Sequence, residues 1–123
     1  MNSLSTNLPR SPDSIRTARH LVNDNTITLS LQRRQDAALM VSELVTNAVQ
    51  HGIGAITLRI EAEPGAVRVE VADEGIVAVA PSPAPGADGG WGLRIDDQLA
   101  DDWGILEGST RVWFRLGQPA PQR

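Results

Sequence analysis

Hydrophobic residues at helical spacing mark one long helix in the first half of the chain. From about Gln32 to His51, apolar residues recur every three or four positions along one stripe. The stripe consists of Ala37, Val41, Leu44, Val45 and Ala48. This period predicts an amphipathic helix with one buried side. Gly52 follows directly, and a glycine at this place commonly ends a helix.

A shorter helix is predicted before it. Ser11 and Pro12 are typical of a helix start, with Ser11 as the cap and Pro12 in the first turn. The apolar residues that follow share one face, and they are Ile15, Ala18, Leu21 and Val22. Ahead of this helix the chain is polar, with Leu4 and Leu8 as candidate anchors of a short edge strand.

Strict alternation of apolar and polar residues predicts two β-hairpins later in the chain. The first contains strands over residues 56–62 and 67–72 with a turn at Pro64-Gly65, and the second contains strands over 103–107 and 111–116. We expect the second hairpin to turn at Gly108-Ser109. Its buried face should carry Val112, Phe114 and Leu116.

The connection between the hairpins is rich in proline and glycine. Three prolines within residues 76–89 exclude a regular helix or a central strand, so we expect a loop of about fourteen residues. A loop of this length is typical of a lid or a binding loop, and a disordered linker is the alternative. Gly90-Trp91-Gly92 then opens a helix, where exposed backbone N–H groups can hold phosphate.

Length and composition narrow the class of protein. The 123 residues suit one domain over 1–123, with a core of about 11–116 and flexible ends at 1–10 and 117–123. The chain has no cysteine, which excludes disulfides and thiolate metal sites. No apolar run approaches a membrane span and no secretion signal is evident, so we expect a soluble cytoplasmic protein.

Charge excludes further functions. All 11 basic side chains are arginine, so neither a Schiff-base lysine nor a P-loop lysine is present. The net charge of −4 gives no general attraction to nucleic acid.

Polar residues on the long helix are candidates for chemistry. At roughly 100° per residue, Glu43 and Asn47 share a face separate from the apolar stripe, and His51 continues that line. Asp36 lies on it too. The alternative interpretation is an ordinary solvated helix face.

A carboxylate at the end of the first hairpin is a second candidate. Asp73 has the same parity as Val67, Val69 and Val71, so its side chain should point to the buried face. A buried carboxylate requires a partner. Gly75 follows and allows close approach to the backbone. A simple turn is the alternative, because Asp and Gly are both common in turns.

Together these segments resemble the GHKL (Bergerat-fold) ATPase superfamily, also described as histidine kinase-like ATPase domains. The closer likeness is to the small bacterial anti-sigma-factor serine kinases and their stand-alone actinobacterial relatives. Residues 42–52 resemble the family's N-box, Asp73-Glu74-Gly75 resembles its adenine-binding motif, and residues 89–93 resemble its second glycine box. The resemblance covers roughly residues 11–116.

This resemblance implies a fold and a ligand. The fold is an α/β (α+β) two-layer sandwich, in which a mostly antiparallel mixed sheet is covered on one face by helices. ATP lies between the helix layer and a lid. Asn47 would ligate Mg²⁺, Glu43 would act as general base, Asp73 would accept a hydrogen bond from the adenine amino group, and Gly75 would leave room for the ring. The implied binding set is Asn47, His51, Asp73, Gly75, Gly90, Gly92 and Leu93.

Three functions remain open from the sequence. The first is an ATP-dependent anti-sigma factor that binds a sigma factor and phosphorylates a serine or threonine of an antagonist protein. The second is a non-catalytic, nucleotide-dependent protein-binding module with a degenerate ATP site. The third, a detached histidine kinase domain, is disfavoured because His20 lacks the acidic neighbour of a phospho-accepting histidine. None involves direct nucleic-acid or membrane binding, and a homodimer is left open.

Overall fold

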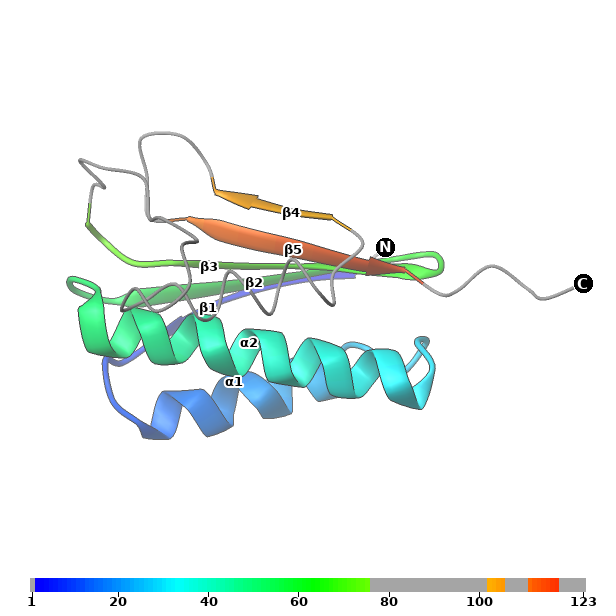
Figure 1. The fold of residues 1–123 in the computed structure, drawn as a ribbon, viewed down its shortest axis with the longest axis horizontal. Helices are drawn as coiled ribbons and strands as arrows, with labels where there is room; N and C mark the ends of the chain where they lie inside the picture. The colour runs from blue at the N-terminus through cyan, green and yellow to red at the C-terminus, as the bar shows by residue number, and fades with distance from the viewer. Residues whose placement is uncertain (1, 76–101, 106–110, 118–123) are drawn as a thin grey trace, which may run out of the picture.

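The structure is a computed structural model that describes residues 2–75, 102–105 and 111–117. Two helices cover one face of a five-stranded sheet, which confirms the predicted two-layer α+β fold (Figure 1). The elements are β1 (Asn2–Leu8), α1 (Asp13–Asp24), α2 (Leu31–His51), β2 (Ile56–Glu63), β3 (Ala66–Ala72), β4 (Asp102–Ile105) and β5 (Val112–Gly117).

The sheet has the strand order β1-β2-β3-β5-β4, and all four pairings among the described strands are antiparallel. The first predicted hairpin is confirmed: Glu63 pairs with Ala66 across the Pro64-Gly65 turn. Gly65 has φ +73°, a conformation that a side chain disfavours, which explains glycine at this position. The second hairpin pairs β4 with β5, while its predicted turn lies outside the described residues.

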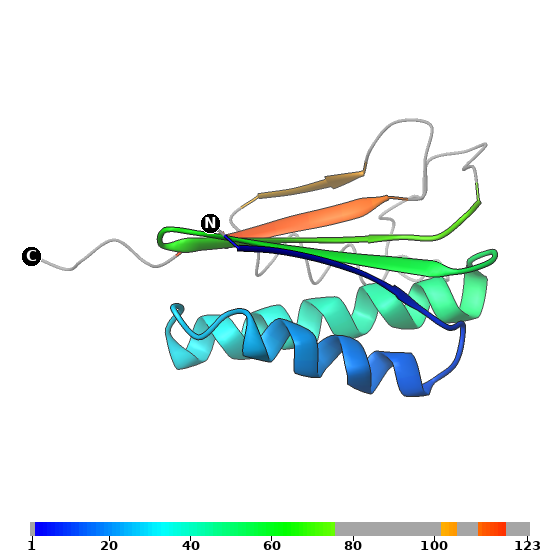
Figure 2. The ribbon, with the colours of Figure 1, turned by 180° about the vertical axis from the view of Figure 1, so that it is seen from behind.

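The amino-terminal segment confirms one expectation and corrects another. Residues 2–8 form the edge strand for which Leu4 and Leu8 were the candidate anchors, in place of a flexible end, and each of them pairs with a residue of β2. Leu8 is buried, and Leu4 packs against the core, as expected of the anchors of such a strand. Figure 2 shows β1 passing along the sheet edge before the chain turns into α1.

The start of α1 also differs from expectation. The helix begins at Asp13, with Pro12 as the residue before it and not in its first turn. Ser11 accepts a hydrogen bond through its hydroxyl from the Asp13 N–H at 3.3 Å, and through its carbonyl from the Ser14 N–H at 3.0 Å. Ser11 therefore forms a turn that leads into the helix.

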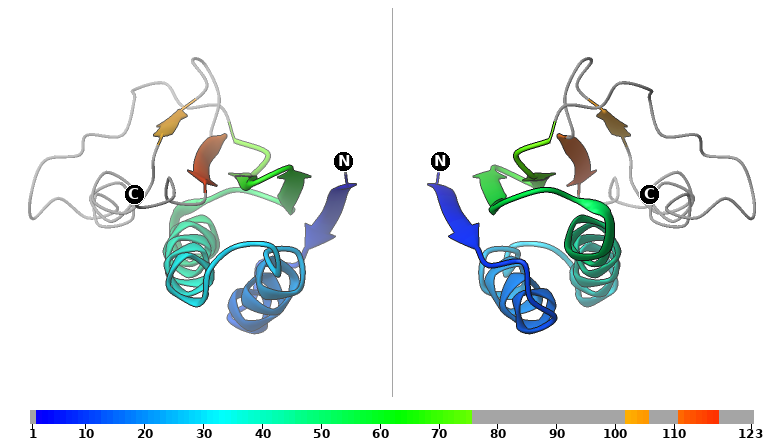
Figure 3. Two further views of the ribbon diagram at one scale, coloured as in Figure 1. Left: turned by 90° about the vertical axis from the view of Figure 1, so that its right-hand side faces the viewer. Right: turned by 90° about the vertical axis from the view of Figure 1, so that its left-hand side faces the viewer.

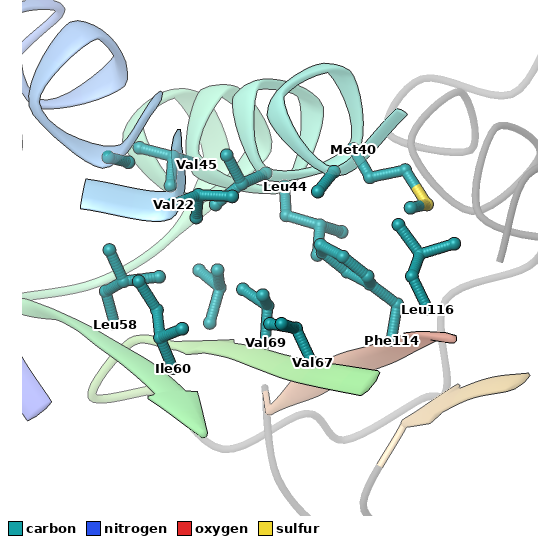
Figure 4. Packing of buried hydrophobic residues seen from close by; sticks show 14 of the residues in the cluster. Val22, Met40, Leu44, Val45, Leu58, Ile60, Val67, Val69, Phe114 and Leu116 are labelled. Atoms are coloured by element: carbon teal, nitrogen blue, oxygen red, sulfur yellow. The ribbon is translucent and has the colours of Figure 1, made fainter. Parts of the chain in front are cut away.

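The core lies between α2 and the middle of the sheet. Figure 3 shows the two helices end-on, with α1 on the side of β1 and α2 on the side of β3 and β5. Figure 4 shows Met40 and Leu44 of α2 opposite Phe114 and Leu116 of β5. The predicted stripe is buried at Ala37, Val41, Leu44 and Val45, and Met40 joins it. Because this stripe is buried, α2 is fixed in its rotation about its own axis.

Charged side chains cover the opposite face of the sheet. Glu70 points away from the helices but is only 5% exposed. Arg68 and Arg111 lie 3.3 and 3.6 Å from its carboxylate oxygens. Arg68 also places its guanidinium carbon 5.0 Å from the centre of the Trp113 ring, a cation–π distance. The arginines therefore compensate the buried carboxylate, whose desolvation would otherwise be costly.

Phe114→Ala tests whether the helix–sheet contact holds the fold. The Phe114 side chain is fully buried beneath α2. Its removal should lower the free energy of unfolding by about 3–5 kcal/mol in urea denaturation. Arg115→Ala is the matched control on the other face of β5, where Arg115 makes a half-exposed ion pair with Glu63. That substitution should cost less than about 1 kcal/mol. Equal losses in the two variants would contradict this account of the core.

Candidate functional site

The long helix α2 carries the first group of candidate residues. The Ser30 hydroxyl caps its first turn by accepting a hydrogen bond from the Arg33 N–H at 3.2 Å. Further along, the hydroxyls of Ser42 and Thr46 bond to the helix's own carbonyls, at Ala38 and Ser42. These two hydroxyls of the N-box-like stretch are therefore engaged within the helix.

Glu43, Asn47 and His51 lie one turn apart on α2, outside its buried stripe, as the sequence predicted. Glu43 and Asn47 are half-buried and His51 is exposed. In the part of the chain that the structure describes, none of the three side chains makes a hydrogen bond or an ion pair. Asp36, at the other end of the row, instead contacts Arg33 and Gln32. Among the described residues, the row thus presents at its centre a carboxylate and an amide that no other side chain engages.

The second candidate, Asp73, lies directly beyond β3 and faces the end of α2. A Cβ atom at Gly52 would overlap the Asp73 carboxylate oxygen Oδ2 and the Ala48 carbonyl oxygen. Gly52 has φ −81°, which any residue can adopt, so it is needed here for space and not for its backbone angle. The carboxylate therefore points to the helix side, as its parity with the buried valines predicted.

Asp73 also organises the short segment that follows it. Its Oδ1 atom accepts a hydrogen bond from the Gly75 N–H at 2.7 Å. This is the local turn that the sequence left open as an alternative. The turn and the buried-side orientation occur together, so the two interpretations of Asp73 do not exclude each other.

A loop contact joins the two halves of the candidate site. The Glu74 N–H donates to the Ile53 carbonyl at 2.9 Å, and the Glu74 carboxylate accepts from the Ala55 N–H at 2.8 Å. Between them Gly54 has φ +70°, and a Cβ atom there would overlap the Glu74 carboxylate. The connection from α2 to β2 is thereby held against residues 73–75.

Other predicted site residues fall outside the described part of the chain. These are Gly90, Gly92 and Leu93, together with the proposed lid at 76–89 and the helix expected after it. The structure thus places Glu43, Asn47 and His51 on one helix and brings the Asp73 carboxylate to the end of that helix, with the Gly75 N–H hydrogen-bonded to it. For these residues the position is observed, while their roles stay predictions.

The described residues include few side chains that could ligate a metal ion together. Among residues 2–75, 102–105 and 111–117, no cluster of three or more His, Asp or Glu could hold a metal ion. A site built only from protein ligands is therefore absent from this part. A single amide oxygen on α2 fits an Mg²⁺ ion that takes most of its ligands from phosphate and water. The donor set is consistent with a metal that arrives with a nucleotide.

The described residues form an α+β domain in which two residues of the predicted motifs, Gly52 and Asp73, meet at the end of α2. Residues 8–116 match the family model of the histidine kinase-like ATPase domain, and the chain belongs to this family. No curated protein matches the chain. Membership of the family supports an ATP-binding regulatory function. No helix in the described residues is both long enough and apolar enough to cross a membrane.

The part played by Glu74 was not predicted. In the sequence Glu74 is only the middle residue of an Asp-Glu-Gly motif, although its side chain reaches a loop 19 residues earlier in the sequence. The pair of glycines at positions 52 and 54 was the available signal. Two glycines so close together after a helix indicate that another segment approaches the backbone there.

Gly52→Ala tests the contact between the helix end and Asp73. The added methyl group would overlap the Asp73 carboxylate and the Ala48 carbonyl, so we expect a loss of about 1–3 kcal/mol in unfolding free energy. Urea denaturation of a double-mutant cycle with Asp73→Ala isolates the carboxylate's share. The cost of Gly52→Ala should fall when Asp73 is already truncated. Additive costs would show that the two residues do not interact.

Proposed function

We propose that the chain is an ATP-binding regulatory protein of the anti-sigma-factor type, with serine/threonine kinase activity toward an antagonist protein. The observation that carries the proposal is the position of Asp73. Its carboxylate lies against Gly52, at the end of the same helix that carries Glu43 and Asn47. The carboxylate proposed to bind the base therefore lies at the end of the helix that carries the two residues proposed for phosphate chemistry.

Each residue has a separate proposed role at this site. Asp73 accepts a hydrogen bond from the adenine amino group, and Gly75 leaves space beside the ring. Asn47 offers its amide oxygen to Mg²⁺, which supplies positive charge to the phosphates when it is bound. Backbone N–H groups at Gly90 and Gly92 would hold phosphate oxygens, with Leu93 and His51 completing the binding set.

Glu43 has the one role that is specific to catalysis. It would take the proton of a serine or threonine hydroxyl as that oxygen forms its bond to the γ-phosphorus of ATP. The bond between that phosphorus and the β,γ-bridging oxygen breaks, and ADP leaves. The absence of a hydrogen bond or ion pair to the Glu43 side chain within the described residues supports this role, because a general base must be available to accept a proton.

The protein partners in this proposal are a sigma factor and its antagonist. Their binding is inferred from the likeness to anti-sigma-factor kinases. Co-purification from cells, followed by mass identification of the bound chains, tests this directly. A partner that is unrelated to transcription would remove the anti-sigma role and leave the nucleotide site as proposed.

Asp73→Asn tests whether Asp73 recognises adenine. The substitution keeps the size but removes a charged acceptor, so Mg·ATP binding should weaken by about 1.5–3 kcal/mol in calorimetry. The preference for ATP over GTP should also relax, because guanine has a carbonyl where adenine has its amino group. Asp24→Asn, an exposed change at the far end of α1, is the matched control and should leave affinity unaltered. An unchanged base preference in Asp73→Asn would refute the role.

Glu43→Ala separates an enzyme from a binding module. Mg·ATP affinity should stay within a few-fold, while phosphoryl transfer to the co-purified antagonist should fall by about 10²–10⁴-fold. Asn47→Ala provides the contrast, since losing the metal-binding amide should weaken Mg·ATP itself. Transfer of labelled phosphate measures the rate, and calorimetry measures the affinity.

The same experiment shows which function holds if transfer is absent. A wild-type chain that binds Mg·ATP and its partner without any phosphoryl transfer, together with an unchanged Glu43→Ala variant, would contradict the kinase role. The non-catalytic binding module would then be the function.

A further inference from the structure

Two backbone segments that are distant in sequence are joined by one side chain at the candidate nucleotide site. Glu74 bonds to the α2–β2 loop twice: through its own N–H to the Ile53 carbonyl, and through its carboxylate to the Ala55 N–H. The side chain crosses Gly54 between these bonds. We call this arrangement, made by Ile53, Gly54, Ala55 and Glu74, the loop clasp.

The loop clasp is adjacent to the residue that would read the base. Asp73 immediately precedes Glu74, and its carboxylate lies against Gly52, immediately before the clasped loop residues. Asp73 is also bonded to the Gly75 N–H on the other side of Glu74. The Glu74 backbone and side chain therefore both tie the residue after Asp73 to the loop that begins beside Gly52.

We infer that Glu74 is a positioning residue for nucleotide selection: it holds Asp73 in place by clasping the α2–β2 loop. This inference rests on the proposed function, because it assumes that Asp73 contacts the adenine. Glu74 itself need not touch the nucleotide. Its carboxylate is engaged by a backbone N–H, which gives it a definite partner at 2.8 Å.

The chain shows why a glutamate and a glycine are needed together. A carboxylate accepts the Ala55 N–H more strongly than a neutral group would, because the acceptor is charged. Gly54 supplies both the positive φ angle and the space that the carboxylate occupies. A side chain at Gly54 would exclude the Glu74 carboxylate from its present position.

The test compares three substitutions at Glu74 in the full chain, with Mg·ATP and Mg·GTP as ligands in calorimetry. Glu74→Ala should lower the affinity for Mg·ATP by about three- to tenfold, the range expected when one hydrogen bond is lost. Affinity for Mg·GTP should change less, because that base does not use the Asp73 acceptor. Glu74→Gln should recover most of the loss, since its amide oxygen can still accept from Ala55. Glu74→Asp is a second truncation that shortens the reach, and it carries the test if Glu74→Ala does not fold.

Glu61→Ala is the matched control. Glu61 lies on β2, on the face of the sheet away from the helices, and forms an ion pair with Arg59 on that same face. Glu61→Ala therefore removes one negative charge, as Glu74→Ala does, and leaves the loop clasp untouched. Its nucleotide affinities should equal those of the wild type. Amide hydrogen exchange at Ala55 provides a readout that is independent of nucleotide: exchange should accelerate in Glu74→Ala and not in Glu61→Ala.

The outcomes distinguish the inference from the proposed function. Faster exchange at Ala55 with unchanged Mg·ATP affinity would overturn the positioning role while leaving the nucleotide site intact. Equal losses of Mg·ATP and Mg·GTP affinity would also overturn it, because general loosening of the site does not select a base. A wild-type chain that binds neither nucleotide would overturn the proposed function and, with it, this inference.

Discussion

The burial of one stripe of α2 against β3 and β5 is the constraint on which the rest of the structure depends. Leu44 and Met40 lie opposite Phe114 and Leu116, so α2 can neither rotate nor slide without opening the core. A helix held in this way has its other faces fixed too. The orientation of Glu43 and Asn47 is therefore a product of apolar packing, although neither residue belongs to the core.

Much of this arrangement could be predicted from the sequence because it depends on the short repeats at which apolar residues recur along helices and strands. The helical period marked the buried side of α2, and the two-residue period marked β2, β3 and β5. Parity along β3 even indicated the side to which Asp73 points. These features follow from local geometry, in which the direction of a side chain is set by its place in the repeat.

The remaining features depend on contacts between segments, which a period does not encode. Glu70 alternates as an outward residue should, yet it is buried and pairs with arginines from β3 and from the residue before β5. Gly52 ends α2 as expected, and its missing side chain also admits Asp73, which the sequence did not indicate. The Glu74 contact likewise needs two loops to meet. In each case at least one partner lies on a segment far away in the sequence.

The edge strand β1 has a consequence for how the molecule can assemble. The side chains of Asn7 and Thr57 are joined by a hydrogen bond across 50 positions, with both helices in the intervening chain. Closing an unstructured loop of that length costs about 3.5 kcal/mol in chain entropy from its length alone. Packed helices return the chain to the sheet and reduce that cost. Strand β1 and the helical layer therefore favour each other's formation, and the amino-terminal strand acts as a cooperative part of the domain.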